Sequence, residues 1–429
     1  MRCGKEAEGR GAGALDLVNA TRLAIVSCWL LASVRAPAED WPQILGPRRD
    51  GTYRGGDLAE GWAAEGPPVV WKKSVGHGFS GPAVTRGRLI LFHRLGDKET
   101  VDCLDASTGE KRWTFDYPTS YHDSFGFDDG PRATPTIADG RIYTHGAEGK
   151  IHCLDLEKGT SLWEFDARAQ LGAAEGYFGL ACSPLVEGNR VLLNIGGKDG
   201  AGVIGLEKSS GKLSWKATSD EASYSSPVAA TIGGKRLALF FTRAGLVGID
   251  PVAGPIQFEF PWKTRIRASA NSVTPLIQGD LVFVSACYGA GAALVRIKGR
   301  QTETVWSGDE SLSNHYATSV LHGGFLYGFH GRQEEGPSLR CVELETGKVK
   351  WSKDRFGAGS LLEADGKLLI LTEEGKLVIA PARPEGFEPT ASAQILPEGV
   401  ARALPGLADG RLYARNESLL VCIDLRRKK

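Results

Sequence analysis

The sequence lacks several features that would assign a function directly. Its 429 residues carry 51 basic and 51 acidic side chains, and this balance gives no support for binding to nucleic acid or to an anionic membrane surface. It has no H-E-x-x-H or C-x-x-C-H motif, no phosphate-loop lysine motif and no G-x-S-x-G elbow. Zinc peptidase, haem, nucleoside triphosphate and serine hydrolase sites are therefore not indicated.

Methionine occurs once, whereas glycine occurs 56 times. Because glycine serves turns and weakens helices, this composition favours short strands joined by many turns. The apolar run "LAIVSCWLLAS" after Arg22 is too short to span a bilayer stably. It is followed by Ala36-Pro37-Ala38, which fits the small-x-small cleavage pattern of an export signal. We expect residues 1–38 to direct the protein to the periplasm or cell envelope.

Two details qualify this signal. The polar stretch Met1 to Thr21 is long for the region that precedes an export signal, which suggests that translation starts downstream of Met1. Cys28 lies in "IVSC", which matches a lipoprotein acceptor only loosely. Residues 39–66 then form an N-terminal lead segment, and residues 67–429 the folded domain.

A self-similar unit recurs through this domain. One copy, from Gly81, reads "GPAVTRGRLILFHRLGDKETVDCLDASTGEKRWTF", and the next, from Ala133, reads "ATPTIADGRIYTHGAEGKIHCLDLEKGTSLWEF". Further copies begin at Cys182, Ser226, Thr274, Thr318, Ser360 and Leu404. A period of roughly 40–50 residues indicates a solenoid or a propeller. Each unit offers four short alternating stretches with no helical period, which predicts an all-β, eight-bladed propeller of four-stranded blades.

The turns and the ends of the chain agree with this prediction. Asp139-Gly140, Asp365-Gly366 and Asp409-Gly410 suit two-residue hairpins, which need a positive φ. The last copy lacks its outer strand, whereas "PPVVWKK" before the first copy supplies an unassigned strand. We expect this N-terminal strand to complete the last blade and close the ring. One aromatic residue per blade then packs between blades: Trp71, Trp113, Trp163, Trp215, Phe258, Trp306 and Trp351.

No two cysteines are adjacent. Four of them share one slot of the repeat, before a Leu/Val/Ile-Asp/Glu pair: Cys103, Cys153, Cys341 and Cys422. Equivalent slots in different blades lie far apart, so these cysteines are expected to be small buried hydrophobic residues. Export would permit a disulfide between Cys182 and Cys287, but the spacing does not favour one.

At "LDASTGEKRW" and "LETGKVKW" the repeat resembles that of the pyrroloquinoline-quinone (PQQ) propellers, and in size and layout the chain is similar to the exported BamB-like group. "WPQILGPRRDG", "GPRATPTI" and "RLYARN" extend the likeness over nearly the whole domain. The resemblance implies an eight-bladed ring without a cofactor. It implies a non-catalytic binding or scaffold protein, expected to be monomeric, with a possible partner in outer-membrane assembly.

The same resemblance carries an alternative from another class. Quinoprotein dehydrogenases share the repeat and hold PQQ with Ca²⁺ at the ring centre, where the cofactor stacks between a Trp and a disulfide of adjacent cysteines, with an Asp as base. On this alternative Asp123, Asp128 or Asp129 would supply the cation ligand or the base. The two hypotheses differ in whether these acids point into the axial funnel over an aromatic floor.

Three long loops are expected on one face, around the funnel. The first, Asp116 to Arg132, is the richest in polar groups; the others are "SLSNHYA" and "HGRQEEGPS". The candidate ligand-binding residues are Tyr121, His122, Asp123, Asp128, Asp129, Arg132, His315, Tyr316, His330 and Arg332. They either line a polar pocket for a protein or small-molecule ligand or cap and solvate the rim. In the second case His122 pairs with Asp123, and Arg132 forms a buried ion pair between blades.

Two further patterns have structural explanations. Thr134, Ser183, Ser225, Ser226 and Ser272 lie near the starts of the inner strands, where crowding at the axis requires small side chains. "GAGVIG" at residues 200–205 matches a dinucleotide fingerprint formally. That fingerprint requires a following helix, whereas this stretch leads into a repeat strand, so it is interpreted as a hairpin. His145 and His152 are assigned to blade structure, and no metal site is expected.

Overall fold

The computed structural model describes residues 39–427, apart from residues 57, 265 and 267–270. The chain divides into two units, Met1–Arg35 and Ala36–Lys429. The expected export signal and Cys28 lie outside the described residues. No helix within the described part is long and apolar enough to cross a membrane.

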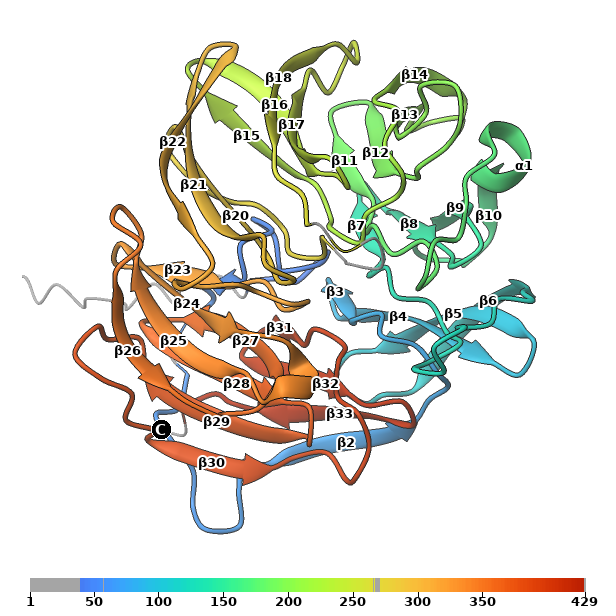
Figure 1. The fold of residues 1–429 in the computed structure, drawn as a ribbon. Helices are drawn as coiled ribbons and strands as arrows, with labels where there is room; N and C mark the ends of the chain where they lie inside the picture. Colours follow the sequence, from blue (N-terminus) through green and yellow to red (C-terminus); the bar gives the residue numbers. More distant parts are fainter. Residues whose placement is uncertain (1–38, 57, 265, 267–270, 428–429) are drawn as a thin grey trace, which may run out of the picture. The chain divides into compact units, whose positions relative to one another are not determined.

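The described residues form eight sheets around a common axis, which confirms the eight-bladed propeller (Figure 1). The first four blades are β3–β6 (Ala83–Thr85, Arg88–Leu95, Lys98–Asp105, Lys111–Pro118), β7–β10 (Thr136–Ala138, Arg141–His145, Lys150–Asp155, Ser161–Asp166), β11–β14 (Leu185–Glu187, Arg190–Asn194, Val203–Glu207, Leu213–Ala217) and β15–β18 (Val228–Ile232, Lys235–Phe241, Gly245–Ile249, Ile256–Pro261). The next three are β19–β22 (Leu276–Gln278, Leu281–Ala286, Gly291–Lys298, Gln301–Gly308), β23–β26 (Val320–His322, Phe325–His330, Ser338–Glu343, Val349–Lys353) and β27–β30 (Gly359–Ala364, Lys367–Thr372, Lys376–Pro381, Ala391–Gln394). In each blade the first strand is the innermost.

The eighth blade closes the ring as the sequence predicts. It consists of β31 (Gly406–Ala408), β32 (Arg411–Arg415), β33 (Leu419–Asp424) and, as its outer strand, β2 (Val69–Ser74) from the other end of the chain. β2 pairs antiparallel with β33. The only helical turns in the described part are α1 (Ala167–Leu171) and the 3₁₀ turn η1 (Gln333–Glu335), both in connections between strands.

Local sequence accounts for the hairpins and for the burial of each strand. Asp139 and Gly140 have φ of 50° and 72°, the left-handed values that the two-residue turn requires. Outer strands such as β14 alternate exposed and buried residues, whereas middle strands such as β13 are buried on both faces because blades pack on either side. The stretch "GAGVIG" runs into strand β13 and not into a helix.

Five tryptophans of the repeat pack on the glycine turn of the following blade: Trp71, Trp113, Trp163, Trp215 and Trp306. Trp351 instead donates its indole N–H to the carbonyl of Arg383. A Cβ built at Gly159 would lie 2.4 Å from the Trp113 ring, and one at Gly211 would lie 2.6 Å from that of Trp163. The indole N–H of Trp113 also donates to the carbonyl of Leu156 at 3.1 Å. The T-G-K turn therefore needs glycine because an indole occupies the space where a side chain would lie.

A chain of hydroxyl groups links the inner strands. The backbone N–H before an inner strand donates to the hydroxyl at the equivalent position of the next blade. The pairs are Gly81 with Thr134 (3.1 Å), Thr134 with Ser183 (2.9 Å), Ser183 with Ser226 (3.0 Å) and Thr274 with Thr318 (3.0 Å). The small hydroxyl residues near the axis thus satisfy backbone donors that no sheet partner reaches.

The six cysteines in the described residues are free and buried. Burial raises the pKa of the Cys103 and Cys153 thiols to about 11. Cys182 and Cys287, the one pair that the sequence left open, form no disulfide.

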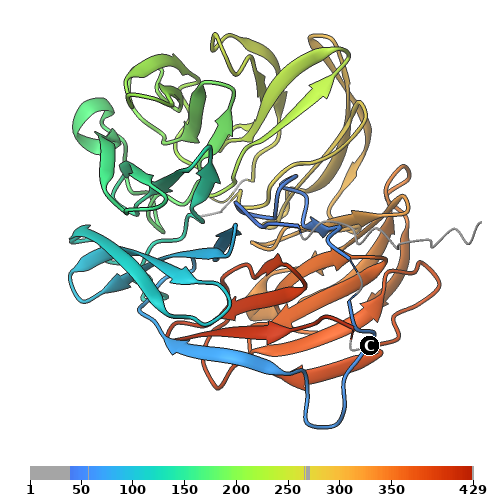
Figure 2. The same cartoon turned by 180° about the vertical axis from the view of Figure 1, so that it is seen from behind.

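The lead segment, residues 39–66, adds a strand to one blade and a buried arginine to the packing of two others. It runs near the centre of the ring (Figure 2), where β1 (Thr52–Tyr53) adds a parallel strand to β27. The guanidinium of Arg49, 2% exposed, donates to the carbonyls of Pro227 (2.9 Å), Ser183 (3.2 Å) and Pro184 (2.9 Å). Burial lowers the pKa of Arg49 to about 10. This arginine ties the segment to the third and fourth blades.

Candidate functional site

The candidate site is a cavity of about 460 Å³ at the axis, on the face where loops enter the inner strands. We call it the funnel. Seven blades contribute a side chain from the same register, two residues before the small residue or leucine that opens the inner strand. We call this the funnel position; its residues are Phe79, Arg132, Ala181, Tyr224, Ser272, Tyr316 and Arg402. Ile44 of the lead segment also lines the funnel.

Aromatic rings and arginines dominate the lining. The Phe79 ring lies between two guanidinium groups, with its centroid 5.5 Å from Cζ of Arg132 and 5.6 Å from Cζ of Arg402. Arg402 also lies 5.0 Å from the Phe127 ring, so it is held between two phenylalanines. Stacking of this kind fixes the plane of a guanidinium and excludes water from its faces.

A glutamate outside the lining orients Arg402. Nε of Arg402 donates to Oε1 of Glu373 at 2.6 Å, and the Tyr316 hydroxyl donates to the same oxygen at 2.6 Å. Burial, followed by the Glu373 charge, raises the pKa of Tyr316 well above its ordinary value, so this hydroxyl stays protonated and remains a donor. Glu373 comes from the loop between β28 and β29.

A tyrosine–histidine pair forms a further part of the wall. The Tyr288 hydroxyl lies 2.7 Å from Nε2 of His315, and Nδ1 of His315 accepts from the Gln333 N–H at 3.3 Å. Burial lowers the pKa of His315, which favours the neutral ring with its proton on Nε2, donated to Tyr288. Arg332 stacks 4.8 Å from the Tyr288 ring. Tyr288 has φ of 67°, a conformation that an aromatic residue adopts only when its surroundings impose it.

The acidic residues of the long loop fold the loop itself. Asp123 accepts hydrogen bonds from the backbone N–H groups of Phe125 (2.9 Å), Phe127 (3.2 Å) and Asp128 (3.2 Å), and its carboxylate pairs with Arg132 at 2.9 Å. Asp128 accepts from the Gly78 and Gly130 N–H groups. These bonds turn the loop so that Phe125 and Phe127 face the funnel, 51% and 47% exposed.

The structure separates the ten candidate residues of the sequence into two groups. Arg132, His315, Tyr316 and Arg332 line the funnel. Tyr121, Asp123 and Asp128 are buried within the long loop, His122 and Asp129 are on its surface, and His330 accepts from the Ser313 N–H. His122 pairs with Asp129 (3.1 Å) and not with Asp123, and Arg132 pairs within its own loop and not between blades.

Sequence reasoning missed the aromatic part of the lining. It missed Phe79, Phe125, Phe127, Phe178, Tyr224, Tyr288 and the cation Arg402. The repeat register contains a signal for several of them, because "RATP" at 132–135 and "RALP" at 402–405 place their arginines identically. Phe79 and Tyr224 occupy the same register in their own blades.

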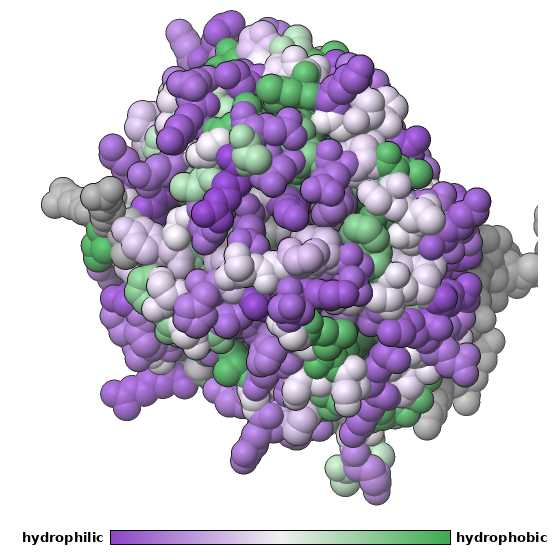
Figure 3. All heavy atoms as spheres, turned by 90° about the vertical axis from the view of Figure 1, so that its right-hand side faces the viewer, coloured by the Kyte–Doolittle hydropathy of each residue, from purple (hydrophilic) through white to green (hydrophobic). Residues whose placement is uncertain are grey.

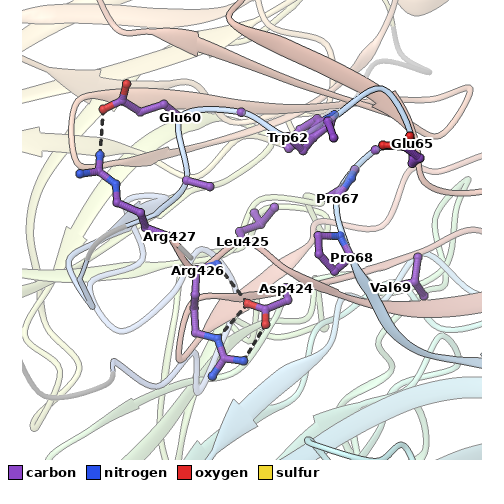
Figure 4. Close-up of a pocket in the computed structure, with 14 residues that line it drawn as sticks. Glu60, Trp62, Glu65, Pro67, Pro68, Val69, Asp424, Leu425, Arg426 and Arg427 are labelled. Carbon is purple, nitrogen blue, oxygen red and sulfur yellow. Dashed lines mark hydrogen bonds and ion pairs between the residues drawn. The ribbon is translucent and has the colours of Figure 1, made fainter. Parts of the chain in front are cut away.

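Two other cavities lie outside the funnel. One, of about 530 Å³, adjoins it and shares Tyr224 as a wall. The other, of about 1030 Å³, lies at the outer edge of the ring, between residues 59–69 and the stretch after β33 (Figure 4). Four of its charged residues pair with each other, Glu60 with Arg427 at 2.8 Å and Asp424 with Arg426 at 2.6 Å. The flank that carries α1 and β6 is largely polar, with small separate apolar patches (Figure 3).

The comparison with known proteins agrees with the fold. The model of a family described as outer membrane protein assembly factor BamB matches residues 97–353, more than half of the chain. The chain belongs to this family. A BamB structure from Moraxella catarrhalis superposes with a TM-score of 0.62 at 15% identity, covering 84% of this chain and 98% of that chain. At this identity the likeness shows the fold, a PQQ-repeat propeller.

Relatives of this BamB-family chain come from two functional classes. Quinoprotein alcohol dehydrogenase PedH of Pseudomonas putida is 26% identical over 233 residues, 53% of this chain and 35% of PedH. BamB of Moranella endobia is 19% identical over 264 residues, 58% of this chain and 64% of that protein. The chain thus spans about a third of the length of one relative and just under two thirds of the other.

The funnel of this BamB-family chain does not fit PQQ with Ca²⁺. A calcium site needs six to eight oxygen ligands, but no group of three or more His, Cys, Asp or Glu side chains in the described part could hold a metal ion. Asp123, Asp128 and Asp129, which the dehydrogenase alternative requires, are committed to loop hydrogen bonds and do not line the funnel. Among the described residues, its lining includes no tryptophan and no cysteine.

Proposed function

We propose that the chain is a non-catalytic binding protein of the cell envelope, exported and monomeric, that holds a protein or small-molecule ligand in the funnel. The observation that carries this proposal is the shared register of the lining. Seven blades direct their funnel-position side chains to one cavity, and the long loop adds two exposed phenylalanines. A cavity of this size, apolar with a few placed polar groups, is typical of ligand sites.

The family description favours one kind of partner, a component of outer-membrane protein assembly. Export is supported by the signal-like sequence of residues 1–38. The lining supports a ligand with an apolar surface and an anionic group, because rings alternate with guanidinium groups.

The experiment is a titration of the purified chain with 8-anilinonaphthalene-1-sulfonate, an aromatic anion whose fluorescence rises in apolar sites. We expect saturable binding at one site, lost in the double variant Phe125→Ser, Phe127→Ser. The matched control is Val252→Ser, which removes an apolar side chain that is 62% exposed outside the funnel lining. Binding that survives the double variant unchanged, or that falls equally in the control, would remove the funnel as the site.

A parallel titration with PQQ and Ca²⁺, read by melting temperature and by dye reduction with primary alcohols, addresses the dehydrogenase alternative. We expect no response, because the acids nearest to the funnel arginines, Asp123 and Glu373, lie outside the lining and are already paired with those arginines. Saturable PQQ binding together with alcohol-dependent dye reduction would overturn the non-catalytic proposal.

A further inference from the structure

Among the three arginines of the funnel, Arg402 has the most unused hydrogen-bonding capacity. Arg132 spends Nη1 on Gly130 O and Nη2 on Asp123 and Asp128 O. Arg332 directs both Nη groups to neighbouring glutamates of its own loop. In the described residues Arg402 bonds through Nε alone, which leaves the outer edge of the guanidinium with its Nη donors unspent.

This free edge belongs to a group that is already oriented. The Arg402 side chain is 17% exposed and lies between Phe79 and Phe127, while Glu373 holds it from behind. A guanidinium edge presents two parallel N–H donors that match the two oxygens of a carboxylate. Because the arginine is fixed and partly dehydrated before a ligand arrives, such a pair costs little side-chain entropy and is weakly screened.

The surroundings of the funnel point to a ligand longer than a single small molecule. Phe125 and Phe127 present about half of their surface outside the packed loop. The neighbouring cavity of about 530 Å³ begins on the other side of Tyr224, whose hydroxyl accepts from the N–H groups of Tyr177 and Phe178. A ligand anchored at Arg402 can therefore cover the exposed rings and continue into the second cavity only if it is extended.

We propose that the funnel binds an extended segment of a partner protein in which an acidic side chain pairs with Arg402 and a neighbouring aromatic side chain packs on Phe125 and Phe127. This inference rests on the proposed function and specifies the ligand of the same site. Recognition of an acidic side chain depends on one arginine, whereas the aromatic contact depends on the long loop, so the two contributions can be separated.

The experiment uses two peptides that differ in one group: acetyl-Gly-Ser-Phe-Glu-Phe-Ser-Gly-amide and the same sequence with Gln in place of Glu. Their binding to the purified chain is measured by calorimetry and by displacement of 8-anilinonaphthalene-1-sulfonate. We expect the Glu peptide to bind about tenfold to a hundredfold more tightly, the size of one charge-assisted pair in a partly buried site. Arg402→Gln should abolish this preference, so that the variant binds the two peptides with equal affinity.

The matched control is Arg236→Gln. Arg236 is also paired with a glutamate, Glu187 at 2.7 Å, but lies outside the funnel lining, and its loss should leave the preference intact. A preference that survives Arg402→Gln would overturn the proposal. Equal affinity for the two peptides would also overturn it while leaving the proposed function standing, whereas failure of both peptides and of the fluorescent anion to bind would refute the proposed function itself. Equal binding of 3-phenylpropionate and the Glu peptide would assign the site to small aromatic acids and reject the extended segment.

Discussion

Two tryptophans in the same repeat slot differ in one hydrogen bond, and this difference gives a direct test of how the blades are held together. Trp163 and Trp215 are 8% and 9% exposed, and each packs on the glycine turn of the next blade. The indole N–H of Trp163 donates to Lys208 O at 3.1 Å. That of Trp215 is buried without a partner in the described part of the chain.

Replacing either tryptophan by phenylalanine removes a similar apolar area. The two replacements differ in the polar group that is lost, which is a hydrogen-bonded N–H in Trp163 and, in Trp215, a buried N–H without a partner among the described residues. Trp163→Phe loses a hydrogen bond worth about 1 kcal/mol, whereas Trp215→Phe removes an unsatisfied buried donor that costs about 1–3 kcal/mol. Lys208 O keeps a second donor from Arg141 at 3.0 Å, so the first substitution leaves no orphaned carbonyl. We expect Trp163→Phe to be the less stable variant by about 2 kcal/mol, roughly a thirtyfold difference in the unfolding constant.

The assay is urea unfolding followed by far-ultraviolet circular dichroism, since tryptophan fluorescence changes with the substitution itself. The fourth blade already has Phe258 in this slot, 3% exposed, so phenylalanine fits the geometry. Equal losses of stability in the two variants, or a larger loss for Trp215→Phe, would refute the view that the indole N–H contributes to blade docking.

Two further predictions concern buried groups elsewhere in the ring. Arg49→Met removes three charge-assisted hydrogen bonds to backbone carbonyls and should lower the free energy of unfolding by about 2–5 kcal/mol, with a smaller loss for Arg49→Lys; a methionine variant as stable as the parent in urea would contradict the role of this residue as a clamp. Burial lowers the pKa of His152 to about 4, below the ordinary value of 6.5, so the unfolded chain binds more protons between these values. Stability contributed by the neutral ring is therefore complete above pH 6.5 and lost as the pH falls toward 4, by up to about 3 kcal/mol. His152→Phe, which can keep the stacking on Tyr117 at 4.3 Å, should weaken this dependence in melting curves recorded from pH 7 to pH 4, and an unchanged slope would count against it.

The ring was predictable because its information is periodic. The aromatic slot, the glycine turn and the small residue before the inner strand recur in copy after copy, so a weak signal in one unit is reinforced by the others. Closure by β2 followed from the same counting, since a strand without a blade precedes a blade without a strand. The clamp formed by Arg49 has no such repeat, and its partners lie 134 to 178 residues away in the chain. Nothing local distinguishes it from the neighbouring Arg48.

The funnel was predicted only in part because polar residues in a loop have two competing uses. Asp123 and Asp128 appeared as candidate ligands, yet a carboxylate in a glycine-rich loop finds backbone N–H donors a few residues away and folds the loop around itself. The apolar residues of that loop were passed over, although Phe125 and Phe127 have no core to enter and must face either the funnel or solvent. The repeat position that Arg132 and Arg402 share is the sequence signal that distinguishes them from the other loop residues.

Two positions of the repeat, the docking slot and the funnel position, also explain why proteins that share this fold perform different tasks. In this chain the docking slot holds Trp or Phe in every blade where it was identified, and in five of these blades the indole covers a glycine turn of the next blade. The funnel position, by contrast, holds Phe, Arg, Ala, Tyr and Ser in different blades of the same chain. Its side chains line the cavity, and the inner strands do not require one residue type there. This register can therefore vary from blade to blade, and function follows it and not the fold. An alcohol dehydrogenase and an outer-membrane assembly factor can share the propeller for that reason, and the chemistry of Arg402, Phe125 and Phe127 is where the activity of this chain has to be tested.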